Sequence, residues 1–146
     1  MKKSIIRLIV TGILTSISTG LWACTFEKGT YELVDNPAFR LQFLPPDPDS
    51  AVQLATAKIS DRGTVFLQGY VTASQGFSTI YLVPDNPSLT TANISILPLG
   101  SDLRRSETDD AHVMIEDLPS QLYYLDPELW AKHRLVGAVW KRIACR

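Results

Sequence analysis

Hydrophobic and polar residues alternate along several short stretches of this chain. Alternation with a period of two is typical of a strand that buries one face. The stretch 39–43 shows it most clearly, because its large apolar residues are separated by Arg40 and Gln42. The stretch 64–73 is rich in β-branched and aromatic residues, which favour strands. The pattern therefore predicts a chain built mainly of short strands.

Other segments of the same character extend the predicted sheet. Further strands are expected at 30–34, 78–83, 93–99, 113–115 and 135–145, while 52–59 suits either a strand or a short helix. Turn-forming clusters separate these segments at 35–37, 45–49, 61–63, 74–76 and 84–87. The polar stretch 103–111 is expected to form a mobile surface loop. Some six to eight short strands joined in this way favour a barrel or sandwich over an α/β fold.

Two glycines inside the predicted strands favour the barrel over the sandwich. Gly69 and Gly137 each interrupt an apolar run, where glycine is typical of a bulge or a sharp bend. Such bends form the corners of small closed barrels. We therefore expect a small antiparallel barrel, in the first place a five-stranded one of the OB type, with a sandwich as the alternative. One short helix is expected from Asp126 to about His133, since Asp126 can cap it and Pro127 suits its first turn.

The first residues have the character of an export signal. Three basic residues lie within the first seven positions, and an apolar stretch without acidic side chains follows up to Trp22. A retained membrane span is disfavoured, because threonine, serine and glycine dilute the apolar run. We predict a signal peptide at 1–23 and a single β-rich domain at 24–146, a length that suits one domain.

The residues around the cleavage point resemble a bacterial lipobox. Leu21, Ala23 and Cys24 stand where that motif has leucine, a small residue and the lipidated cysteine, whereas Trp22 replaces its usual small residue. In such lipoproteins a diacylglycerol on the cysteine sulfur holds the protein on a bilayer. The motif therefore predicts lipidation of Cys24. The alternative is ordinary cleavage that leaves Cys24 as a thiol.

The second cysteine, Cys145, could instead form a disulfide with Cys24. Export leads to an oxidising compartment, where disulfides persist. Cys24 and Cys145 lie at the two ends of the mature chain, and the ends of a domain are often close together. A bridge between them is compatible with a soluble periplasmic domain that acts as a binding or inhibitor protein. Lipidation and the disulfide exclude each other, because a lipidated sulfur cannot form a disulfide.

The charge of the mature chain bears on its partners. From Cys24 onward there are 11 Lys and Arg against 15 Asp and Glu, a net charge of −4. Proteins that bind nucleic acid usually carry a basic patch or stripe. No basic stripe with interleaved aromatic residues stands out in this sequence. We therefore expect no nucleic-acid partner.

One group of residues has side chains of the types that bind metal ions. Asp109, Asp110, His112 and Glu116 lie close together in the sequence, and a small enzyme using them is a third hypothesis. A metal site needs defined geometry and supporting contacts around its ligands. A solvated acidic loop that enters a strand accounts for these residues more simply. We therefore expect no metal and no cofactor.

Nucleophilic chemistry has little support either. If Cys24 is lipidated, Cys145 and His133 form the one Cys–His pair of the mature chain. A reactive thiolate needs a positively charged, positioned setting, and the sequence indicates none around Cys145. We therefore expect no catalytic residues and no small-molecule substrate. The hypothesis is a binding or structural module rather than an enzyme.

Aromatic residues gather in the last quarter of the chain. Tyr123, Tyr124, Trp130 and Trp140 lie there, and tyrosine and tryptophan are enriched at interfaces. We predict that Trp140 belongs to the core. Tyr123, Tyr124 and Trp130 are the candidates for contact with a partner.

Several short motifs resemble those of one known family. They are Ile96-Leu97-Pro98-Leu99, Leu125-Asp126-Pro127, the closing run 135–139, the glycine strand at Gly69 and the lipobox. Together they resemble the Slp family of outer-membrane lipoproteins of Gram-negative bacteria, over about half of the mature chain. The resemblance implies a lipid-anchored β-barrel domain at the outer membrane. Our hypothesis is a module of this kind that faces the periplasm and has an envelope protein as its candidate partner. The resemblance implies no catalytic residues.

Overall fold

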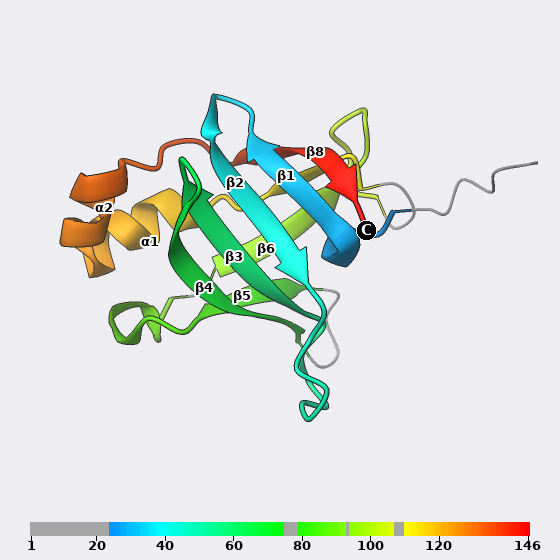
Figure 1. Cartoon of the computed structure of the whole chain (residues 1–146), viewed down its shortest axis with the longest axis horizontal. Coiled ribbons are helices and arrows are strands. Elements are labelled where there is room, and N and C mark those ends of the chain that lie inside the picture. The colour runs from blue at the N-terminus through cyan, green and yellow to red at the C-terminus, as the bar shows by residue number, and fades with distance from the viewer. Residues whose placement is uncertain (1–23, 75–78, 93, 107–109) are drawn as a thin grey trace, which may run out of the picture.

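The computed structural model describes residues 24–74, 79–92, 94–106 and 110–146. In this part of the chain one antiparallel sheet closes on itself as a barrel (Figure 1). Its strands are β1 (Gly29–Leu33), β2 (Asn36–Leu44), β3 (Ala55–Asp61), β4 (Thr64–Ala73), β5 (Ile80–Pro84), β6 (Ile94–Leu99), β7 (His112–Met114) and β8 (Val139–Cys145). The prediction of a mainly β chain folded as a small antiparallel barrel is confirmed. The predicted signal peptide at 1–23 lies outside the described residues.

The strand order differs from the expected OB-type barrel. An OB barrel has five strands in Greek-key order. Here each of the eight strands pairs with the next along the chain, and β8 returns to pair with β1. The very short connections β1–β2 and β3–β4 account for two of these pairings, because such a connection can join only antiparallel neighbours. The β3–β4 turn is one example, with Arg62 and Gly63 both at positive φ (46° and 83°).

Side chains fill the inside of the barrel. Burial alternates residue by residue along β1 and β3, as the hydrophobic pattern predicts. The largest fully buried side chains include Trp140, Tyr31, Phe39, Phe43, Leu41, Ile59, Leu67 and Leu82. Trp140 is thus a core residue, as predicted. An eight-stranded barrel is just wide enough for side chains to fill, and this interior is a packed core.

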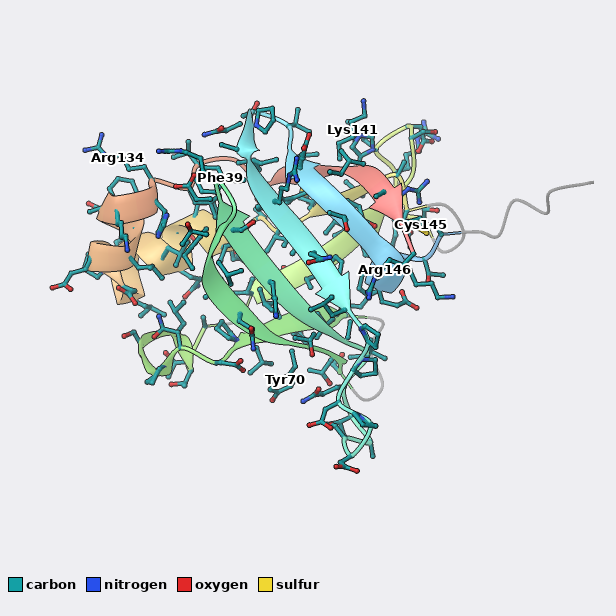
Figure 2. All side chains as sticks on the ribbon, in the orientation of Figure 1. Phe39, Tyr70, Arg134, Lys141, Cys145 and Arg146 are labelled. Carbon is teal, nitrogen blue, oxygen red and sulfur yellow. A yellow bond between two sulfur atoms is a disulfide. The ribbon has the colours of Figure 1, made fainter. Side chains whose placement is uncertain are left out.

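Different elements cover the two ends of the barrel. At one, which we call the helical end, lie α1 (Leu118–Leu125), α2 (Pro127–His133) and the 3₁₀ turn η2 (Pro87–Leu89). At the other, the terminal end, lie the 3₁₀ turn η1 (Phe26–Lys28) and the chain's C-terminus (Figure 1). Figure 2 places Arg134 at the helical end and both Cys145 and Arg146 at the terminal end.

Two helices are present where the sequence predicted one. The predicted helix is α2, and the side chain of Asp126 caps it by accepting the N–H of Leu129 at 3.0 Å. The additional helix, α1, precedes it and buries Leu118 and Leu122, which are four residues apart and share one face. None of the helices in the described residues has the length and apolar character needed to cross a bilayer.

Neither glycine forms a β-bulge, which was one of the two features expected at these positions. Pairing continues without a register shift through Gly69, and the shift between β3 and β4 lies at Ile59/Ser60 instead. Glycine is required at position 69 because β5 passes so close that an added Cβ would lie 2.3 Å from the carbonyl oxygen of Val83. Gly137 lies before β8, at φ 102°, in the connection from the helices.

Candidate functional site

The three predicted contact residues form one cluster on the helical end. The Tyr123 ring centroid lies 5.0 Å from that of Tyr124 and 5.1 Å from that of Trp130. Both ring pairs are nearly perpendicular, with interplanar angles of 84° and 88°, an arrangement that aromatic quadrupoles favour. We call these residues the aromatic cluster. The structure therefore brings together residues from two helices that the sequence could only name separately.

Helix geometry explains why this cluster lies outside the core. The inward face of α1 is occupied by Leu118 and Leu122, so the residues that follow Leu122 turn toward the solvent. Tyr124 is 77% exposed and Tyr123 is 50% exposed. Trp130 of α2 is half-buried and packs against the core, which holds the cluster on a firm support. Exposed aromatic rings fixed in this way are suited to contact with a partner.

The arrangement between the helices is held by hydrogen bonds. Besides capping α2, the Asp126 carboxylate accepts a hydrogen bond from Asn86 Nδ2 at 2.9 Å. Asn86 in turn caps η2 by accepting the N–H of Ser88 at 2.9 Å. Because one carboxylate serves both the start of α2 and the β5–β6 connection, the position of Trp130 relative to the barrel is defined.

At the terminal end, a disulfide joins Cys24 to Cys145. Their Cα atoms are 6.1 Å apart although the residues are separated by 121 positions. Arg142 lies beside the bridge, and its Nη1 donates to the backbone oxygens of Cys24 at 3.0 Å and of Asp110 at 3.1 Å. The bridge and this guanidinium together fix the first described residue to the last strand.

The residues of the sequence-level metal hypothesis are engaged in structural contacts. The Asp110 carboxylate is buried and accepts the backbone N–H of Phe26 at 2.7 Å, which fixes η1 at the terminal end of the barrel. His112 donates from Nδ1 to the carbonyl oxygen of Gly100 at 3.2 Å. Glu116 is exposed, and Asp109 lies outside the described residues. In the described ranges, no three His, Cys, Asp or Glu side chains are grouped as a metal site would require.

The sequence did not indicate that the side chain of His133 is buried at the helical end, in contact with Asp61. His133 Nδ1 lies 3.1 Å from Asp61 Oδ2, and both side chains are less than one-tenth exposed. The imidazole also stacks on Phe66, with a centroid distance of 4.2 Å and an interplanar angle of 18°. His133 is thus at the opposite end of the barrel from Cys145, and the two cannot form a catalytic pair. The contact connects α2 to β3 and supports the fold.

Comparison of the chain with protein-family models, with curated proteins and with solved structures gives no match. The resemblance to the Slp family therefore stays a prediction. The candidate site rests on the geometry of the chain itself, which consists of an exposed aromatic cluster at one end of a packed barrel and a disulfide at the other.

Proposed function

We propose that the mature chain is an exported, soluble binding module of the bacterial envelope, without catalytic activity, that contacts an envelope protein through its aromatic cluster. The observation that carries this proposal is the Cys24–Cys145 disulfide. Disulfides persist in compartments such as the periplasm and are rare in the cytosol, so the bridge supports export. The same bridge favours the soluble form, because the sulfur of Cys24 is already bonded.

The aromatic cluster supports the choice of surface. Residues that dominate binding are enriched in tryptophan and tyrosine, and rigid supports reduce the entropy lost on association. Tyr123 and Tyr124 expose large rings, and Trp130 anchors them to the core. The packed barrel interior supports a role in which the outer surface, rather than the barrel core, makes the contact.

The lipobox at Leu21–Cys24 favours the alternative function, a lipid-anchored module of the outer membrane. The two functions exclude each other, because the lipid and the disulfide both require the sulfur atom of Cys24. The deciding experiment is expression of the full precursor in a Gram-negative bacterium, thiol blocking, and intact mass measurement. We expect a chain that begins at Cys24 and lacks two hydrogen atoms, in the soluble periplasmic fraction. A diacylglyceryl mass on Cys24, with labelled palmitate in the membrane fraction, would contradict the soluble form.

A second experiment tests the surface. A photo-crosslinking side chain placed at position 124 is expected to give a discrete product with an envelope protein, and the same group at exposed Ile143 on β8 is not. Trp130→Ala should reduce the yield at position 124 while the barrel stays folded by circular dichroism. Equal products from both positions, or no effect of Trp130→Ala, would exclude the aromatic cluster as the contact surface.

A further inference from the structure

The terminal end of the barrel carries two neighbouring hollows. One has a volume of about 350 Å³ and lies between η1 and the ends of β4, β5 and β6. The other has a volume of about 310 Å³ and lies between η1, the β2–β3 connection and Arg146. Leu54 and Glu27 line both hollows, so they form one surface depression that we call the mouth groove. Each volume lies in the range typical of small-ligand sites.

The walls of the mouth groove are largely apolar. Ala73, Ile80 and Pro98 line the first hollow, and Pro45 and Pro46 line the second. Leu54, between them, is 42% exposed. An apolar chain lying across Leu54 would remove this surface from water, which favours binding in proportion to the area covered.

The charges around the mouth groove favour an anion. Lys28 and Arg146 line its second hollow, together with the carboxylate of Glu27. The described lining of this hollow thus has one more cationic than anionic side chain, whereas the mature chain as a whole has a net charge of −4. Lys28 is exposed, and Figure 2 shows Arg146 at the same end of the barrel.

We propose that the mouth groove binds an amphipathic carboxylate, with its alkyl chain over Leu54 and its carboxylate toward Lys28 and Arg146. The apolar walls select the chain, and the two cations select the sign of the head group. This site is separate from the aromatic cluster, which lies at the other end of the barrel. The proposal about the mouth groove can therefore be tested independently of the proposed partner surface.

Isothermal titration calorimetry of the disulfide-bonded protein with decanoate, below its micelle concentration, tests the proposal. We expect saturable binding of one decanoate per chain. Decylamine, which has a similar chain and the opposite charge, should bind at least about tenfold more weakly. Leu54→Glu should weaken decanoate binding by about tenfold or more, because it places a charge where the chain lies. Leu125→Glu at the helical end is the matched control and should leave binding unchanged.

Lys28→Glu gives an independent variant on an exposed side chain, should Leu54→Glu fail to fold. It should also weaken decanoate binding and narrow the difference between decanoate and decylamine. Circular dichroism melting of each variant confirms the fold before titration. Absence of saturable decanoate binding, equal binding of decylamine, or binding unchanged by both Leu54→Glu and Lys28→Glu would overturn the proposal.

Discussion

His133 Nδ1 lies 3.1 Å from Asp61 Oδ2, across 72 residues of sequence. The contact joins the last residue of α2 to the last residue of β3. It is the most deeply buried ion-pair geometry among the described residues, since both side chains are less than one-tenth exposed. The helical end is therefore attached to the barrel wall by a polar contact as well as by leucine packing.

His133→Ala removes both the hydrogen bond to Asp61 and the stacking on Phe66. We expect the free energy of unfolding to fall by about 2–4 kcal/mol, because the buried Asp61 carboxylate loses its histidine partner and keeps, among the described residues, only the exposed guanidinium of Arg62, at 3.2 Å. Urea unfolding followed by circular dichroism measures this change. Lys132→Ala, on the exposed neighbour, should change stability by no more than about 0.5 kcal/mol. Similar midpoints for the two variants would show that the contact contributes little.

Reduction of the disulfide should destabilise the protein. The bridge closes a loop of 121 positions, and long loops gain the most in the chain-entropy model. We expect a loss of about 2–5 kcal/mol in the free energy of unfolding when reductant is added. The double variant Cys24→Ser, Cys145→Ser should already show this loss and should not respond to reductant. A wild-type unfolding midpoint that does not move on reduction would contradict the prediction.

Gly69→Ala should be poorly tolerated. The added methyl group would lie 2.3 Å from the Val83 carbonyl oxygen and 2.8 Å from the Pro84 Cα, so β5 must move away from β4. We expect a loss of about 2 kcal/mol or more, in the range of other overpacked sites. Differential scanning calorimetry gives the shift in Tm. Gln68→Ala, on the exposed neighbour, is the control, and an equal Tm for both variants would rule out the close approach.

Asp126→Ala should loosen α2 and with it the aromatic cluster. The carboxylate that caps α2 and accepts from Asn86 is lost, and we expect a cost of about 1–2 kcal/mol. Asp117 occupies the same position before α1 without a side-chain capping bond, so Asp117→Ala should cost less. Hydrogen exchange at the Leu129 and Trp130 amides is the sensitive measurement. Equal protection in both variants would contradict the role of Asp126.

The local chemistry of the chain predicted much of this structure. The cap at Asp126, the turn at Arg62-Gly63 and the core position of Trp140 follow from residue type and near neighbours, and each is confirmed. The helix α1 was missed because only Leu118 and Leu122 mark its buried face, and Pro119 resembles a helix breaker. Proline is in fact tolerated there, in the first turn.

Long-range relationships could not be read in the same way. The pairing of Asp61 with His133 depends on the barrel's curvature, which brings the end of β3 under α2, and no local pattern records it. The number of strands depends on closure between β1 and β8, which are the first and last strands of the described residues. Of the candidate site, the residues of the aromatic cluster were predicted, whereas their mutual contacts required the arrangement of two helices.

Closure between β1 and β8 has a consequence for how the molecule is made. The ribosome delivers β8 last, so β1 keeps one edge without a partner until Val139–Cys145 has emerged. Strands that are far apart in the sequence pair slowly, and an unpaired strand edge can pair with a strand of another chain. The period after β8 becomes available therefore decides whether an incomplete barrel closes upon itself or pairs with a neighbouring molecule.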